Sequence, residues 1–164
     1  EEVYFDIIRR KTASLIAACC ACGAASTGGD ADQVDVMWKF GEKTGLAFQI
    51  KDDLFDFEKV NLTGKPAGID IKEQKMTLPL IHALTEATPK QRKYIIRTIK
   101  KHHDRPKKVQ EVVDFVRHSG GLDYARLRME EHITKAKDLL YTFPGSDVRD
   151  SFESLLEFTV ARKK

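Results

Sequence analysis

Apolar residues recur at helical spacing along almost the whole chain, and this feature limits the fold more than any other. The spacings of three and four residues that place side chains on one face of an α-helix begin at Val3 and continue to the C-terminus. The strict alternation typical of a half-buried β-strand never persists. The sequence therefore predicts an all-α protein, an antiparallel bundle whose helices bury their apolar faces against one another.

Prolines, glycines and capping residues divide this pattern into helices. We expect a first helix from about Val3 to Cys22 and a second from about Gln33 to Glu58, with Asp30 or Asp32 as the cap of the second. A loop rich in glycine and proline then precedes Thr77. The remaining helices are expected from residue 77 onward and over residues 89–103, 105–119, 122–143 and 146–164.

Composition indicates one globular domain over residues 1–164, with 41% hydrophobic and 32% charged residues. The net charge of +3 is too small to indicate a nucleic-acid partner. We find no run of 18 apolar residues and no cleavable leader pattern, and the three free cysteines suit a reducing compartment. These observations predict a cytoplasmic protein. The chain starts directly on a helical pattern, which is typical of the middle of a longer sequence.

The segment FQIKDDLFDF, residues 48–57, places three aspartates among large apolar side chains. On a helical wheel the polar side chains of this stretch share one arc about 100° wide. They are Gln49, Asp52, Asp53 and Asp56. Large apolar side chains, Leu46 and Ile50 among them, fill most of the rest of the wheel.

Two interpretations of this polar arc compete. In one, the aspartates form a solvated face. In the other, they look into a polar cavity, and a cation offsets the repulsion among three like charges within two helical turns. Mg²⁺ suits the second interpretation because it prefers carboxylate oxygens and keeps waters or phosphates in its shell. Lys65 and Lys75 follow nearby, and lysine suits a phosphate ligand, which favours the second interpretation.

Three motifs together resemble the trans-prenyl diphosphate synthases, the polyprenyl synthetase family. The motifs are KTASLIAACC, GLAFQIKDDLFDF and GKPAGIDIKEQKMTLPLIHAL. The segment GLAFQIKDDLFDF contains DDxxD, which is the second of the family's two aspartate-rich motifs. The resemblance implies an isoprenoid synthase bundle around a deep cavity, usually dimeric. It implies Mg²⁺-dependent condensation of an allylic diphosphate with isopentenyl diphosphate. The basic stretch KKHHDRPKK has two interpretations, solvated surface or peripheral contact with an anionic membrane for product release.

The resemblance also implies roles for individual residues. Asp52, Asp53 and Asp56 match the Mg²⁺ ligands, direct or through water. Thr12 and Gln49 match the polar residues that face the developing cation. The lysines that match the family's diphosphate-binding positions are Lys11, Lys65 and Lys75.

One departure from the family pattern leaves alternatives open. The family's first aspartate-rich motif and its isopentenyl diphosphate site lie upstream of the Lys11 helix, and neither is among these 164 residues. We therefore expect the chain to be the C-terminal portion of one synthase domain, inactive by itself. A non-catalytic isoprenoid-binding or regulatory subunit is the alternative. A terpene cyclase is a third interpretation, but the Asn/Ser/Glu metal motif of cyclases is absent.

Overall fold

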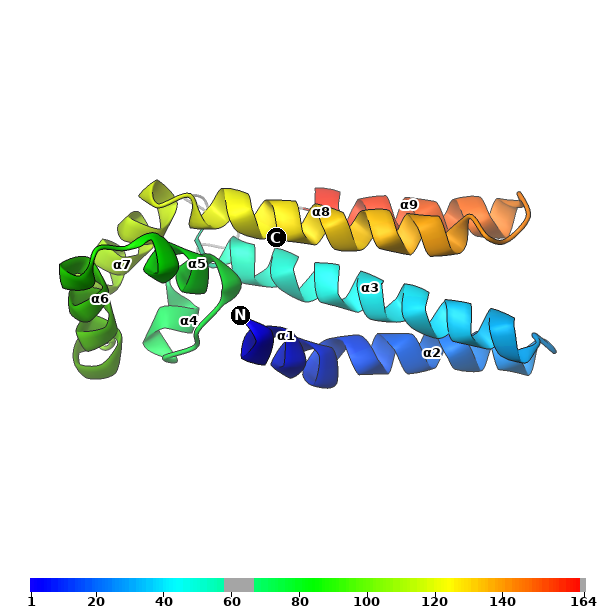
Figure 1. Cartoon of the computed structure of the whole chain (residues 1–164), viewed down its shortest axis with the longest axis horizontal. Helices are drawn as coiled ribbons and strands as arrows, with labels where there is room; N and C mark the ends of the chain where they lie inside the picture. Colours follow the sequence, from blue (N-terminus) through cyan, green and yellow to red (C-terminus); the bar gives the residue numbers. More distant parts are fainter. Residues whose placement is uncertain (58–66, 163–164) are drawn as a thin grey trace. The chain divides into compact units, whose positions relative to one another are not determined.

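The computed structural model describes residues 1–57 and 67–162 and contains no β-strand in that part of the chain. The prediction of an all-α protein is confirmed. The helices labelled in Figure 1 are α1 (Glu2–Ile8), α2 (Ser14–Ser26), α3 (Ala31–Phe55), α4 (Ile69–Lys72), α5 (Leu78–Glu86), α6 (Pro89–His102), α7 (Pro106–His118), α8 (Gly121–Leu140) and α9 (Asp147–Ala161). A π-helical turn, η1 (Arg9–Ala13), connects α1 and α2.

The chain divides into two compact units, which we describe separately. The long-helix unit comprises residues 2–51 and, among the described residues, 128–162. The short-helix unit comprises residue 1, the described residues from 52 to 57 and residues 67–127.

In the long-helix unit η1 and α2 lie against α3, and two glycines of α3 let the backbones approach closely. A Cβ atom on Gly41 would lie 2.7 Å from the Cα of Ala17, and one on Gly45 would lie 2.5 Å from the Cα of Ala13. The α8–α9 hairpin packs against the same helix, with Phe40 of α3 in edge contact with Phe152 of α9. The first turn of α3 carries the expected aspartate cap, because Asp30 accepts the Gln33 N–H at 2.8 Å.

The π-turn η1 interrupts the first expected helix. The buried side chains of the continuous stretch fall at Tyr4, Ile8, Ala13, Ala17 and Ala21. Their spacing is four residues throughout, except for one step of five between positions 8 and 13. The wider π-turn absorbs the extra residue, so the buried faces of α1 and α2 stay in line. The prediction of one regular helix over this stretch is wrong at this point.

The short-helix unit is built around the apolar faces of α4 to α7. Its core follows from helical periodicity, since Val109, Val112, Val113 and Val116 all lie on one face of α7 and are fully or almost fully buried. The other buried members of this core are Phe57, Ile71, Leu80, Ala83, Leu84, Ile95 and Ile99.

The expected helices of this unit begin close to their predicted starts. Thr88 forms a capping box with Gln91 at the start of α6, and Gly120, with φ of +72°, follows the end of α7. The short helix α4 was not predicted, because its four residues lie in the segment that we expected to be a loop. No helix of the described chain is both long enough and apolar enough to cross a membrane.

His132 is a buried titratable group in the long-helix unit. Its imidazole lies 5.6 Å from the ring of Phe5, centroid to centroid, and neither ring nitrogen has a hydrogen-bond partner within the described residues. Burial lowers its pKa from 6.5 to about 4, and the positive charges of Lys43, Lys135 and Arg128 act in the same direction. The carboxylate of Glu42 opposes them.

We expect this histidine to make the fold acid-sensitive. In the unfolded chain His132 takes up a proton near pH 6.5, whereas in the folded chain it does so only near pH 4. The unfolded state therefore binds more protons as the pH falls through this window. The free energy of unfolding should decrease by roughly 3 kcal/mol. Urea unfolding across the window measures this slope, and His132→Leu should flatten it while His118→Gln should not. An unchanged slope in His132→Leu would assign the acid sensitivity to other groups.

Candidate functional site

The aspartate-rich segment lies at the C-terminal end of α3. The side chain of Asp52 is half-buried, whereas Asp53 and Asp56 are only 6% and 8% exposed. Two carboxylates with so little contact with solvent do not fit the interpretation of a solvated face. A buried carboxylate is stable only where donors or cations surround it. The segment is thus a site at which charge has been concentrated away from water.

Asp56 holds the start of α4. Its two carboxylate oxygens accept the backbone N–H groups of Ile69 and Asp70 at 2.8 and 3.0 Å, and its own carbonyl accepts the N–H of Gly68 at 3.0 Å. Gly68 has φ of +84°, and a Cβ atom there would lie 2.5 Å from Val109, so only glycine fits. Sequence reasoning missed this role of Asp56, because nothing local indicates which amide its carboxylate will find.

The role of Asp56 in holding α4 leads to a contrast among the aspartates. Asp56→Ala should lower the free energy of unfolding by about 1–3 kcal/mol, because two amides of the α4 turn lose their acceptor. Asp52→Ala should lower the free energy of unfolding by less, because the side chain of Asp52 is only half-buried. Chemical denaturation of both variants measures the difference. Equal stability of the two variants would show that solvent replaces the carboxylate of Asp56 at no cost.

Lys75 follows α4 and is tied to it. Its ammonium lies 3.2 Å from Asp70 and 2.5 Å from Glu73, and its side chain is half exposed. The hydrogen bond to Glu73, and then that to Asp70, raise the pKa of Lys75, while the little burial it has acts against them. The amine is therefore a firmly charged donor, held through Asp70 beside the turn that Asp56 holds.

Thr12 and Gln49 meet in the long-helix unit. The hydroxyl of Thr12, in η1, donates to the side-chain oxygen of Gln49, in α3, at 2.8 Å. Both residues are half-buried, and they are 37 positions apart in the chain. Lys11, their neighbour in η1, is exposed. Two residues singled out from the sequence for one role are thus in direct contact. Lys65, the remaining predicted lysine, lies outside the described residues.

The carboxylates fit a metal ion only if that ion keeps most of its shell for other ligands. Across residues 1–57 and 67–162 no three side chains of His, Cys, Asp or Glu are arranged to hold a metal by themselves. Asp52 and Asp53 are adjacent and point about 100° apart on the helix. Mg²⁺ is commonly bound by one or two carboxylates together with water and substrate phosphates. The donor set is adequate for that mode of binding.

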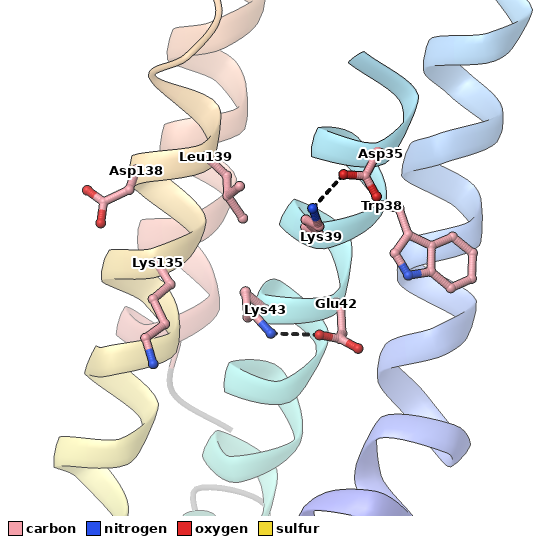
Figure 2. A pocket seen from close by; sticks show the side chains of 8 residues that line it. All are labelled: Asp35, Trp38, Lys39, Glu42, Lys43, Lys135, Asp138 and Leu139. Atoms are coloured by element: carbon pink, nitrogen blue, oxygen red, sulfur yellow. Dashed lines mark hydrogen bonds and ion pairs between the residues drawn. The ribbon is translucent and has the colours of Figure 1, made fainter. Parts of the chain in front are cut away.

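The long-helix unit also contains a groove of about 650 Å³ between α3 and α8, which sequence reasoning did not single out. Figure 2 shows two ion pairs along its α3 side, Lys39 with Asp35 at 2.5 Å and Lys43 with Glu42 at 2.6 Å. Their opposite charges lie side by side, so we see no charge pattern in the groove that indicates one class of ligand. The other lining residues are Trp38, Lys135, Asp138 and Leu139.

Comparison with known sequences gives a consistent result. The profile of the polyprenyl synthetase family matches residues 1–116. The short chain isoprenyl diphosphate synthase of Methanothermobacter thermautotrophicus is 35% identical over 99% of this chain and 50% of its own length. The octaprenyl diphosphate synthase of Escherichia coli is 32% identical over 100% of this chain and 51% of its own. The chain thus spans about half the length of these relatives.

Comparison with solved structures agrees. A geranylgeranyl pyrophosphate synthase from Bacteroides thetaiotaomicron has a TM-score of 0.90 and 38% identity, covering 99% of this chain and 54% of the other. A polyprenyl synthase from Caulobacter crescentus, described as complexed with calcium and isoprenyl diphosphate, has a TM-score of 0.92 and 34% identity. That match covers 100% of this chain and 50% of the other.

Proposed function

Because this chain belongs to the polyprenyl synthetase family, we propose that it forms the C-terminal portion of a single isoprenoid synthase domain that makes a polyprenyl diphosphate. The reaction is the head-to-tail condensation of isopentenyl diphosphate with an allylic diphosphate, a step of isoprenoid biosynthesis. One observation carries the proposal. The DDxxD motif ends α3 with two nearly buried carboxylates, in a chain whose relatives are named as prenyl diphosphate synthases.

We propose that Asp52, Asp53 and Asp56 hold divalent metal, directly or through water. The family generally depends on a divalent metal, and Mg²⁺ is the ion that we propose here. When bound, such an ion withdraws charge from the leaving diphosphate and so favours ionisation of the allylic C–O bond. A relative described with calcium and isoprenyl diphosphate together supports this pairing of metal and diphosphate.

The lysines are proposed to bind the diphosphate itself. Lysine is a compact point charge that suits phosphate oxygens, and Lys75 is held close to α4 by Asp70 and Glu73. When a diphosphate oxygen takes the place of one of these carboxylates, the ammonium of Lys75 remains paired with a negative charge. Lys11 and Lys65 are assigned the same role from their places in the family motifs.

Thr12 and Gln49 are proposed to stabilise the allylic cation. Their hydrogen bond fixes the orientation of two oxygen dipoles before substrate arrives, so little reorganisation is needed when positive charge develops. Amide and hydroxyl oxygens are suited to this role because they are poor nucleophiles at neutral pH. After the double bond of isopentenyl diphosphate attacks the cation, loss of a proton completes the new five-carbon unit.

The proposal extends to location and partners. We place the enzyme in the cytoplasm as a homodimer, with peripheral membrane contact for release of an apolar product. A non-catalytic isoprenoid-binding or regulatory subunit is the second candidate. The intact second motif argues against it, since a subunit that only binds has no need of metal ligands.

A condensation assay on the intact protein tests the proposal. Radiolabelled isopentenyl diphosphate with an allylic diphosphate and Mg²⁺ should yield labelled product that extracts into organic solvent. Chelation of the metal should abolish the product, and added Mg²⁺ should restore it. Binding of the diphosphates without any incorporation, in an intact dimer, would instead favour the subunit that only binds.

Lys75 gives a prediction that is independent of turnover. Lys75→Ala should weaken binding of a non-reactive diphosphate analogue about tenfold or more, because one charged donor is lost. The melting temperature should change little, because the side chain is half exposed. Calorimetric titration measures the affinity. Lys72→Ala, at the end of α4, is the matched control. Equal affinities of wild type and Lys75→Ala would show that Lys75 is a solvated surface residue that does not bind the diphosphate.

A further inference from the structure

The contact between η1 and α3 is closer than ordinary helix packing. A Cβ atom on Gly45 would lie 2.5 Å from the Cα and 2.9 Å from the Cβ of Ala13, the last residue of η1. Both residues are buried, Ala13 completely. The nearest obstacle is backbone, which cannot swing aside like the end of a long side chain. No residue larger than glycine fits at position 45 unless η1 moves away from α3.

The close contact lies beside the Thr12–Gln49 hydrogen bond. Thr12 precedes Ala13, and Gln49 follows Gly45 by four residues, one turn along the same face of α3. The bond is 2.8 Å long, so outward movement of η1 by even one ångström takes it beyond hydrogen-bond length.

The π-turn explains why this contact and this bond occur together. The step of five residues between Ile8 and Ala13 turns Ala13, rather than Thr12, toward Gly45. The turn is closed by the N–H of Ser14, which donates to the carbonyl of Arg9, and by the hydroxyl of Ser14, which donates to the carbonyl of Arg10 at 2.8 Å. Because Ala13 packs against Gly45, Thr12 lies at the edge of this contact, and its hydroxyl donates to the side chain of Gln49.

We infer that Gly45 is a positioning residue: its missing side chain seats the π-turn Arg9–Ala13 against α3 and thereby sets the direction of the Thr12 and Gln49 oxygens. Gly45 itself touches no substrate and acts only through these two side chains. The inference about catalysis rests on the proposed function, whereas the inference about the hydrogen bond does not.

Gly41 provides a matched comparison. A Cβ atom on Gly41 would lie 2.7 Å from the Cα of Ala17 and 2.8 Å from the carbonyl oxygen of Ile16, which is nearly as tight as at Gly45. This second contact, however, falls on the regular helix α2, four residues beyond η1. Gly41→Ala therefore disturbs the same pair of helices without acting first on Thr12. Gly23→Ala, with no atom within 4 Å of its Cβ, controls for the substitution alone.

The test is a double-mutant cycle in the intact synthase. Thr12→Val should lower kcat in the wild-type, Gly23→Ala and Gly41→Ala backgrounds. Gly45→Ala should lower kcat about a hundredfold with little change in KM, as expected when reacting groups are misplaced by about an ångström. Adding Thr12→Val to Gly45→Ala should then have little further effect. Multiplicative effects of the two substitutions, or a wild-type kcat in Gly45→Ala, would overturn the inference.

A second readout separates this inference from the proposed function. The same four proteins are unfolded in urea, and the midpoint of unfolding is measured for each. Thr12→Val should shift this midpoint in the wild-type background but not in the Gly45→Ala background. That result stands even if the intact protein has no prenyl-transfer activity. If Gly45→Ala does not fold, Ala13→Gly loosens the contact from the other side without adding volume. An undiminished Thr12→Val midpoint shift in the variant that folds would overturn the inference.

Discussion

Replacement of Asp53 by alanine in the intact protein is expected to lower the rate of prenyl transfer by at least about a thousandfold. Asp53 is 6% exposed at the end of α3, so its charge acts in surroundings with little screening solvent. Asp52→Ala should have a comparable effect, because we propose that both carboxylates hold the metal. Steady-state kinetics at saturating Mg²⁺ measures the loss.

The same substitutions should affect turnover far more than the stability of the fold. Three carboxylates within five positions repel one another, so removal of one relieves part of that repulsion. Asp35→Ala is the matched control, since Asp35 lies on the same helix in a surface ion pair with Lys39 and should retain wild-type turnover. Near-normal turnover of Asp52→Ala or Asp53→Ala at saturating Mg²⁺ would contradict the metal assignment.

The 164 residues purified by themselves are expected to show no sustained isopentenyl incorporation and to self-associate. In the two-motif mechanism that the resemblance to the family implies, metal holds the leaving diphosphate from both sides, and these 164 residues contain only one of the two aspartate-rich motifs. α2 is composed of small and apolar residues on all sides, yet only Ala17 and Ala21 in it are buried. Leu15 of α2 is 68% exposed, and Val3 and Ile7 of α1 are 73% and 54% exposed. Large apolar side chains left exposed in this way favour association with another surface.

Light scattering and the condensation assay test this expectation together. Replacement of Ile7 and Leu15 by lysine should reduce the apparent mass of the self-associated species, because two exposed apolar side chains are replaced by charges. A change of charge at an exposed polar position, Lys90→Glu for example, should not. A clean monomer that incorporates isopentenyl units continuously would refute both the two-motif mechanism and the assignment of this chain as a portion of a synthase.

Much of the fold could be predicted from the sequence, because many of the helices carry boundary signals of their own. Thr88 and Pro89 start α6, and Gly120 follows α7, as their local chemistry requires. The π-turn could not be predicted in this way. Its only signal is one spacing of five residues among buried positions that are otherwise four residues apart. Which positions are buried is known only when the partner helix is known. The helix α4 was not predicted because four residues are too few to show a helical period.

The candidate site was predictable in its residue types and not in its contacts. Asp52, Asp53 and Asp56 stand out by their spacing alone. The hydrogen bond between Thr12 and Gln49 joins residues 37 positions apart, and only packing of η1 on α3 brings them together. The attachment of Asp56 to α4 likewise depends on where the chain returns after residue 66, which local sequence does not encode.

The bonds of Asp56 also have a consequence for how this region tolerates change in length. Asp56 accepts the N–H groups of Gly68, Ile69 and Asp70, so two points of the chain at least 12 positions apart are fixed to each other, which closes a ring in the sense of chain entropy. The entropy of closing such a ring grows only with the logarithm of its length, about 0.6 kcal/mol for each doubling. A longer chain between Asp56 and Gly68 should therefore cost the fold little free energy, as long as Asp56 keeps its hydrogen bonds to the start of α4.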